Sequence, residues 1–262
     1  GRDADYQQAI AEALKIHPTY GDIHRKVGEI TAFYYRFDEA VEHTRKAIAL
    51  DRDNFRAVAD LGAQLMRTGD ERNARRNLEQ AFRIDRWDVQ TYNLLELLDH
   101  LEPFDTITEG DMIIRLAPDE SPVMKNYVPA LARESLDALS RRWEFTPKGP
   151  ILLEMFPRHD DFAVRTLGLP GMIGALGACF GRVVTLDSPP ARPPGMFNWG
   201  ETLWHEMAHV ITLQLSNNRL PRWLSEGTSV YEERRARAEW GRDMDLPFVR
   251  ALERGQVLKI RD

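Results

Sequence analysis

The chain has 262 residues, 43% hydrophobic and 29% charged, a composition typical of folded proteins rather than disordered ones. Its net charge of −6 argues against a nucleic-acid partner, which would favour a basic chain. No apolar run approaches the roughly 20 residues of a membrane-spanning helix. The single cysteine, Cys179, excludes an intrachain disulfide and a zinc site made of cysteines. A metal site in this chain would therefore consist of histidines and carboxylates.

The first hundred residues repeat with a period of 34. Small and aliphatic residues recur in register at that spacing: Ala13, Ala47 and Ala81; Ile16, Leu50 and Ile84; Gly28 and Gly62; Ala40 and Ala74. Paired amphipathic segments with a fixed period are typical of a helix–turn–helix solenoid. We expect an isolated helix over 4–16, full helical hairpins over 21–54 and 55–88, and a further first helix over 89–102. A generic helical bundle is the alternative.

These positions resemble the tetratricopeptide repeat, which has a glycine in its first helix and two alanines in its second. The sequence departs from that pattern at Thr31 and Leu65, where an aromatic residue is usual, and only Pro18 remains of the prolines between repeats. The resemblance implies a concave surface that binds a peptide or a partner protein. Because the chain starts on half a repeat, we expect further residues before Gly1 in the full protein.

The pattern then changes to short strands. Residues 104–118 predict two strands around a Glu-Gly turn, and the continuous apolar runs 151–156 and 182–187 predict two more. Between the runs lies the glycine-rich stretch 168–181, which lacks the Gly-Lys-Ser/Thr ending of a phosphate-binding loop. We expect this stretch to form a mobile loop or an edge strand that borders a cleft.

One long helix is expected among these strands, over 121–143. Ser121 would cap it and Pro122 would lie in its first turn, while Pro129 would kink the helix or delay its start. A second helix is expected over 198–216, with Asn198 as its cap. Together these elements predict a small sheet with helices on one side, and an α+β fold for this half of the chain.

The helix over 198–216 contains the sequence HEMAH. His205 and His209 lie one turn apart, so both imidazoles can reach one ion. Glu206 would lie beside that ion, where a carboxylate can take a proton from a zinc-activated water and pass it to a leaving amine. The pattern arises by chance in roughly one chain in a hundred. Two half-exposed histidines on a surface helix are therefore the alternative.

A second segment, LPRWLSEGTSVYEERR over 220–235, supplies a further ligand. Pro221 favours the start of a helix, and Glu226 lies in its second turn. Folded back on the first helix, Glu226 would complete a zinc site that keeps one position open for water. Glu233, seven residues further on the same face, can accept the free N–H of a ligand histidine. Gly227 would allow the two helices to approach closely.

HEMAH and WLSEG, with Tyr231 and Glu233 behind them, resemble the gluzincin zinc metallopeptidases, the peptidase MA-like group, over about residues 150–240. The resemblance implies a bound zinc ion (Zn²⁺), a general acid/base and a carboxylate that supports a ligand histidine. It assigns these roles to His205, His209 and Glu226 as ligands, to Glu206 as acid/base and to Glu233 as support. With the repeats, the chain is similar to bacterial proteins that couple such repeats to a peptidase MA-like domain.

The sequence departs from this family in ways that bear on specificity. The spacing between His209 and Glu226 is shorter than in the aminopeptidase branch, and no GxMEN-type segment is present to hold a free substrate N-terminus. Both departures favour an endopeptidase over an aminopeptidase. The family's oxyanion-stabilising Tyr or His is absent after Glu233, so we expect it beyond Asp262. Tyr231 falls on another helix face and is expected to pack.

Other candidate residues favour ordinary roles: His159 is expected in a solvated loop, and Cys179 as a small buried hydrophobe. We therefore expect tetratricopeptide-like helices over 1–102 and a zincin-like α+β domain over 103–262. The first hypothesis is a zinc metallopeptidase whose repeats bind substrate or a partner. The second is a non-catalytic scaffold, in which the repeats bind a partner protein and the zincin-like part is structural or degenerate.

Overall fold

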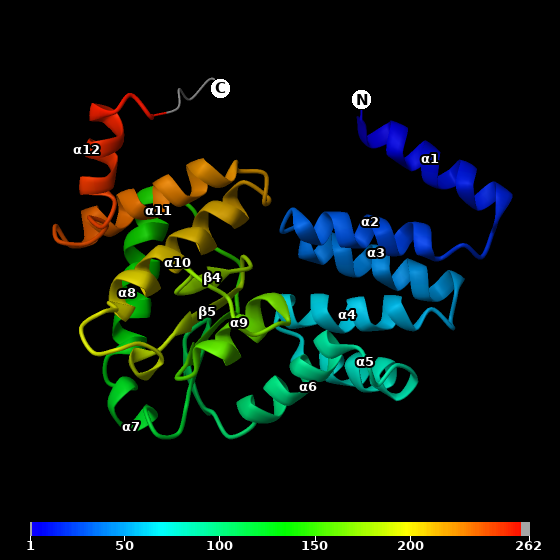
Figure 1. The fold of residues 1–262 in the computed structure, drawn as a ribbon, viewed down its shortest axis with the longest axis horizontal. Coiled ribbons are helices and arrows are strands. Elements are labelled where there is room, and N and C mark those ends of the chain that lie inside the picture. Colours follow the sequence, from blue (N-terminus) through cyan, green and yellow to red (C-terminus); the bar gives the residue numbers. More distant parts are fainter. Residues whose placement is uncertain (1, 258–262) are drawn as a thin grey trace.

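The computed structural model describes residues 2–257, and its N-terminal part is a succession of helical hairpins (Figure 1). The pairs α2–α3 and α4–α5 pack closely as hairpins. The helices expected from the period of 34 are present at the expected positions. They are α1 (Arg2–Ile16), α2 (Asp22–Phe33), α3 (Phe37–Leu50), α4 (Phe55–Thr68), α5 (Glu71–Ile84) and α6 (Val89–Leu101).

The repeated glycines lie where two helices of a hairpin approach most closely. A Cβ on Gly28 would lie 2.5 Å from Thr44 Oγ1, and one on Gly62 would lie 2.6 Å from Leu78 Cγ. Thr44 and Leu78 are themselves 34 residues apart, so both hairpins make the same contact. The period therefore records a repeated packing geometry and not a coincidence of composition.

A five-stranded sheet of order β1-β2-β3-β5-β4 follows the helices. Its three central strands are parallel to one another, and each outer strand pairs antiparallel with its neighbour. The expected strands are confirmed, and the glycine-rich stretch contributes the edge strand β4. The strands are β1 (Asp105–Glu109), β2 (Met112–Leu116), β3 (Ile151–Phe156), β4 (Gly177–Cys179) and β5 (Val183–Asp187). Helices and sheet together form a mixed fold compatible with the α+β class.

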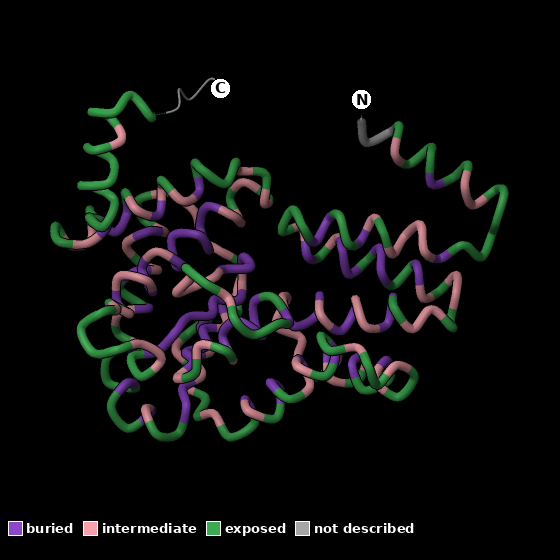
Figure 2. Tube along the Cα trace, in the orientation of Figure 1, coloured by how far each residue is buried: buried purple, intermediate pink, exposed green. Residues whose placement is uncertain are grey.

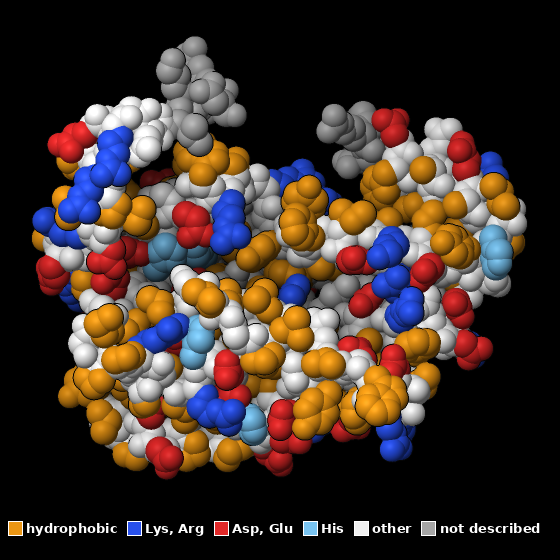
Figure 3. Space-filling view, viewed as in Figure 1, with side chains coloured by type: hydrophobic (Ala, Val, Ile, Leu, Met, Phe, Trp, Pro, Cys, Tyr) orange, Lys and Arg blue, Asp and Glu red, His pale blue; other side chains and the backbone are white. Residues whose placement is uncertain are grey.

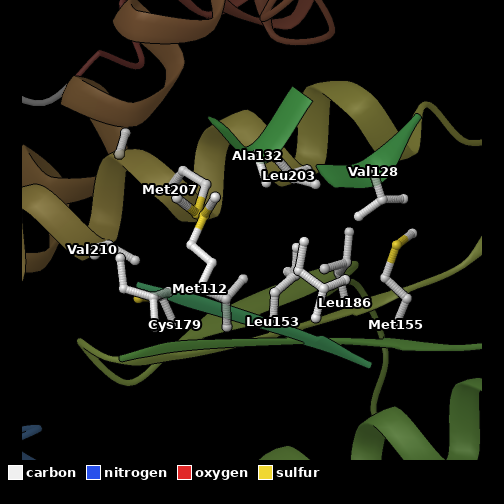
Figure 4. Packing of buried hydrophobic residues seen from close by; sticks show 14 of the residues in the cluster. Met112, Val128, Ala132, Leu153, Met155, Cys179, Leu186, Leu203, Met207 and Val210 are labelled. Atoms are coloured by element: carbon white, nitrogen blue, oxygen red, sulfur yellow. The ribbon is translucent and has the colours of Figure 1, made fainter. Parts of the chain in front are cut away.

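Helices cover both faces of this sheet, so the expectation of helices on one side was wrong. Helices α8 (Val128–Trp143) and α10 (Trp199–Leu215) pack on one face, through the core that Figure 4 shows. On the other face lie α9 (His159–Leu167) and the repeat helices α4 to α6. All residues of β3 and β5 except the half-buried Leu152 are buried, including the polar Glu154, Thr185 and Asp187, and buried residues concentrate around these strands (Figure 2). Burial at consecutive positions is typical of strands covered on both faces.

The long helix expected over 121–143 is divided in two. A short helix, α7 (Ser121–Met124), precedes α8, whose first turn contains Pro129. Proline lacks an N–H and is tolerated only in the first turn of a helix, and α8 accordingly begins at Val128, directly before Pro129. Ser121 does not cap a helix as expected: it is the first residue of α7, and its side chain is buried.

A buried charge network joins the repeat helices to the sheet. Arg165 Nε donates to Glu154 Oε2 at 2.7 Å, and both side chains are fully buried. Arg165 also donates to the Met66 carbonyl of α4 at 2.8 Å. Arg115 lies between Glu154 and Glu71 of α5, at 3.4 and 2.6 Å. Removing one partner of such a pair leaves a buried charge without compensation, so this network favours a single relative placement of helices and sheet.

Two further helices, α11 (Arg222–Ala236) and α12 (Asp245–Glu253), complete the described chain. The sequence analysis did not anticipate α12. Among residues 2–257, no helix is both long and apolar enough to cross a membrane.

A histidine pair between α2 and α3 predicts acid sensitivity. His24 Nδ1 and His43 Nδ1 are 3.1 Å apart, and burial lowers the pKa of both imidazoles. Because the unfolded chain then binds protons more readily, this pair's contribution to stability is present above about pH 6.5 and is lost as the pH falls. We expect the melting temperature to fall between pH 6.5 and 5, and to fall less in His43→Gln. Equal falls in both proteins would contradict this assignment.

Candidate metal centre

The site is built on α10 and α11, which pack against each other. Asn198 caps α10 as expected, since its Oδ1 accepts from the Glu201 N–H at 3.3 Å. The Glu201 carboxylate accepts a second hydrogen bond from the Gly241 N–H, at 2.6 Å, and so ties the segment after α11 to the start of α10. Pro221 precedes α11, in agreement with the expected start of that helix.

The buried positions of α11 are all polar: Ser225, Ser229, Glu232 and Glu233. Polar side chains cost free energy to bury unless they are hydrogen-bonded, so a face of this kind requires partners. Glu232 accepts from Arg142 and from Trp143 Nε1 of α8. The other three side chains hydrogen-bond to the histidines of α10. Helix α11 therefore serves to hold polar groups in place more than to complete an apolar core.

His205, His209 and Glu226 converge. The two Nε2 atoms of the histidines are 3.1 Å apart, and Glu226 Oε2 lies 3.2 Å from His205 Nε2 and 3.6 Å from His209 Nε2. Among the described residues this is the one group of three His, Cys, Asp or Glu side chains placed to hold a metal ion. Figure 3 shows a patch of histidine side chains in a hollow beneath the α10–α11 layer.

The spacing of the three atoms fits zinc. Ligand atoms about 2.1 Å from a tetrahedral ion are about 3.4 Å from one another, close to the 3.1–3.6 Å found here. Burial lowers the pKa of His205, but hydrogen bonds to Glu226 and Glu233 outweigh it and raise that pKa to about 10. Hydrogen bonds from His205 and His209 lower the pKa of Glu226. These shifts favour a positive charge at the point where the three side chains meet, and a divalent cation bound there would supply it.

Each histidine is oriented through its Nδ1 atom, which leaves Nε2 directed at the cluster. The Nδ1–H of His205 donates to Glu233 Oε1, as the sequence predicted for one of the histidines. His209 Nδ1 hydrogen-bonds to Ser225 Oγ at 2.9 Å, and Ser229 Oγ lies 3.3 Å away. The sequence analysis missed both serines. Their signal was the spacing of four residues, which puts them on one face of α11.

Glu206 lies beside the cluster and not in it. Its side chain is buried, and its Oε2 has no hydrogen-bond partner among the described residues. Burial raises the pKa of Glu206, while the charges of His209 and His205 lower it. A buried carboxylate with a free oxygen and a raised pKa is suited to accept and return a proton.

Gly177, on the edge strand β4, brings the backbone of that strand against the Glu206 side chain. A Cβ on Gly177 would lie 2.6 Å from Glu206 Oε1 and 2.7 Å from its Cγ. Gly227, expected to make this kind of approach, does not: a Cβ there would meet no atom within 4 Å. That expectation was wrong because Gly227 lies on the exposed side of α11.

Gly177→Ala is therefore expected to displace the Glu206 carboxylate. Misplacement of a reacting group by about 1 Å can lower turnover about 100-fold. On the first hypothesis, that of a zinc metallopeptidase, we therefore expect a loss of that order with zinc still bound. The measurement is kcat on fluorescein-labelled casein together with zinc content. Gly227→Ala is the matched control, since the same added methyl meets no neighbour. Wild-type kcat in Gly177→Ala would show that Glu206 does not depend on this contact.

Two other candidate residues, Tyr231 and His159, have surroundings that the sequence analysis did not expect. Tyr231 is on another face of α11, as expected, but it does not pack: it is 53% exposed, and its hydroxyl accepts from Arg235 at 2.9 Å. His159 is not in a solvated loop but begins α9. Its Nδ1 lies 3.0 Å from Asp187 Oδ2, and its Nε2 donates to the Met172 carbonyl at 2.6 Å. This histidine therefore anchors the glycine-rich stretch to the sheet. Cys179 is buried, as expected.

No protein-family model, curated protein or solved structure matches this chain.

Proposed function

We propose that this chain is a zinc-dependent metallopeptidase of the gluzincin type. One observation carries the proposal. His205, His209 and Glu226 bring three ligand atoms within 4.8 Å of one another, and Glu206 is buried beside them with a free carboxylate oxygen. A helical scaffold without catalytic function would have no need for a buried, unpartnered carboxylate at this point.

The residues divide the reaction between them. His205, His209 and Glu226 would hold a zinc ion, which when bound would polarise the substrate carbonyl and make water more acidic. Glu206 takes one proton from the attacking water as the water oxygen bonds to the carbonyl carbon. It then delivers that proton to the amine nitrogen as the carbon–nitrogen bond breaks. Glu233 and Ser225 keep the two imidazoles in the orientation that this requires.

An extended peptide is the substrate form that suits this site. Strand β4 is the edge of the sheet, and its outer side has no strand partner within residues 2–257. The same strand touches Glu206 through Gly177. A peptide added to this edge by backbone hydrogen bonds would pass beside the base. With no segment to hold a free N-terminus, an endopeptidase is the activity that we propose.

The helices α1 to α6 are, in this proposal, tetratricopeptide-like repeats that present a protein substrate or bind a partner, and residues 103–262 form a zincin-like domain. The last five of these residues lie outside the described part of the chain. The equal contacts of Gly28 and Gly62 support the repeat assignment. A five-stranded mixed sheet with α10 on one face, and α11 packed on α10, is compatible with the zincin assignment.

The test combines metal content with hydrolysis. Protein purified without added metal would be assayed for zinc by plasma mass spectrometry and for cleavage of fluorescein-labelled casein. We expect about one zinc per chain, cleavage that a chelator abolishes, and recovery on adding zinc back. Zinc without cleavage would favour the scaffold with a structural metal. Neither zinc nor cleavage, even after zinc addition at neutral pH, would reject the proposed function.

A further inference from the structure

The segment that follows α11 turns back onto α10, the helix that carries both histidines. Trp240 packs edge-to-face on Trp204, with ring centroids 6.1 Å apart and planes at 62°. Trp204 directly precedes His205 in the chain. Trp240 also lies over the first turn of α10, where a Cβ on Gly200 would be 3.7 Å from Trp240 Cζ2. The segment after α11 is therefore packed against the ligand-bearing helix and does not extend into solvent there.

Gly241 is held between the two helices by both of its backbone polar groups. Its N–H donates to Glu201 Oε1 of α10 at 2.6 Å, and its carbonyl accepts from Arg234 Nε of α11 at 2.8 Å. Gly241 is buried and has φ of +66°, a left-handed conformation that glycine adopts freely. Because one bond goes to each helix, the position of this residue relative to α10 and α11 is fixed from both sides.

Gly241 lies against the carboxylate that orients His205. A Cβ on Gly241 would lie 2.9 Å from Glu233 Oε2 and 2.9 Å from the Val230 carbonyl oxygen. The other oxygen of the same carboxylate, Glu233 Oε1, accepts from His205 Nδ1. The Glu233 side chain is only 6% exposed. The last torsion of a glutamate side chain is broad, so a backbone wall beside one oxygen helps to select the orientation in which the other oxygen reaches the histidine.

The carboxylate of Glu201 closes a ring of contacts around this bond. Glu201 and His205 are four residues apart on α10, so they lie on one face of that helix. Contacts run from Glu201 to Gly241, from Gly241 to Glu233, and from Glu233 back to α10 at His205. The cap of α10 uses the backbone N–H of Glu201, so the Glu201 Oε1 bond to Gly241 is separate from the capping bond that starts the helix.

We propose that Glu201 is a positioning residue of the metal centre: through Gly241 it holds the Glu233 carboxylate at His205 Nδ1 and so fixes the direction of His205 Nε2. The importance of this for zinc rests on the proposed function, whereas the contacts themselves belong to the chain. Groups that support a metal-ligating histidine change metal affinity about 10- to 100-fold when they are altered. A residue one contact further from the histidine should act at the lower end of that range.

The first experiment measures zinc affinity in the full chain by competition with a chromogenic chelator. Glu201→Ala removes the acceptor of the Gly241 N–H, and we expect it to weaken zinc binding about 10-fold. Glu201→Gln keeps an oxygen that can accept the same bond, so its zinc affinity should return to the wild-type value. Equal losses in the two variants, or no loss in Glu201→Ala, would overturn the proposal.

A double-mutant cycle tests whether Glu201 acts through Glu233. If it does, Glu201→Ala should cause no further loss of zinc affinity in a Glu233→Ala background, because the two changes remove one and the same support. A merely structural role of Glu201 would give the full loss in both backgrounds. That additive result would contradict the positioning role.

Gly241→Ala tests the contact with Glu233 directly. The added methyl would lie against Glu233 Oε2, and we expect zinc affinity to fall about 10- to 100-fold. Gly255→Ala is the matched control, since Gly255 has φ of +64° but a Cβ there would meet no atom within 4 Å. It carries the same backbone strain without touching the metal centre. Equal zinc affinities in the two variants would count against the proposal.

A second readout does not depend on zinc. In the metal-free chain, the hydrogen bond to Glu233 should protect the His205 Nδ1–H from exchange and give a downfield proton resonance, identified by its loss in Glu233→Ala. We expect this resonance in wild type and in Glu201→Gln, and its loss by exchange in Glu201→Ala. A wild-type chain that binds no zinc would reject the proposed function, and the resonance alone would then decide the role of Glu201. An unchanged resonance in Glu201→Ala would overturn that role.

Discussion

Glu206→Gln is expected to abolish most peptide hydrolysis while zinc stays bound. Glutamine has nearly the same shape as glutamate but cannot accept the proton of the attacking water. General acid–base catalysis contributes about 10²- to 10⁴-fold, and we expect a loss of kcat in that range. Because Glu206 is buried beside the ligands and not among them, zinc content should equal that of wild type. The measurement is kcat on fluorescein-labelled casein, with zinc determined on the same sample.

The matched control is Glu239→Gln, which makes the same chemical change at an exposed position. It should leave hydrolysis and zinc content unchanged. Hydrolysis at the wild-type rate in Glu206→Gln would reject the proposed role of this carboxylate. A loss of both zinc and activity would instead identify Glu206 as a group that the site needs in order to bind metal.

Glu226→Ala is expected to weaken zinc binding more than any other single change on α11. The substitution leaves the two Nε2 atoms of His205 and His209 as the remaining members of the ligand group. Changes to residues that merely support metal ligands reduce affinity about 10- to 100-fold, so loss of a ligand should exceed about 100-fold. Competition with a chromogenic zinc chelator would measure the affinity directly.

Glu239→Ala serves as the control here, because Glu239 is exposed on the segment after α11. Its zinc affinity should equal that of wild type. Zinc affinity that stays at the wild-type value in Glu226→Ala would remove Glu226 from the ligand set, and with it the gluzincin assignment. The two variants separate functions: Glu206→Gln should keep metal and lose chemistry, whereas Glu226→Ala should lose both.

Local patterns predicted most of the elements because each is a property of a short segment. The period of 34 placed the repeat helices, and the apolar run 151–156 matches β3. Predictions that depended on how separate segments pack together were less accurate. One helix was expected over 121–143 with Ser121 as its cap. Instead Ser121 is the first residue of the short helix α7, and a second helix, α8, begins beside Pro129. The sheet was expected to have one open face, but α9 and the repeat helices cover it. The continuous runs 151–156 and 182–187 are compatible with cover on both faces but do not say which helices provide it.

The sequence by itself determined which chemical groups this protein can present. The helical period places His205 beside His209 and Glu226 in line with Glu233, whatever surrounds them. Only the tertiary structure decided how these groups combine: which histidine Glu233 orients, and that Gly177 lies against Glu206. Such contacts join segments far apart in the chain. Their distances depend on how helices pack on both faces of the sheet, and a period within one segment carries no information about that packing.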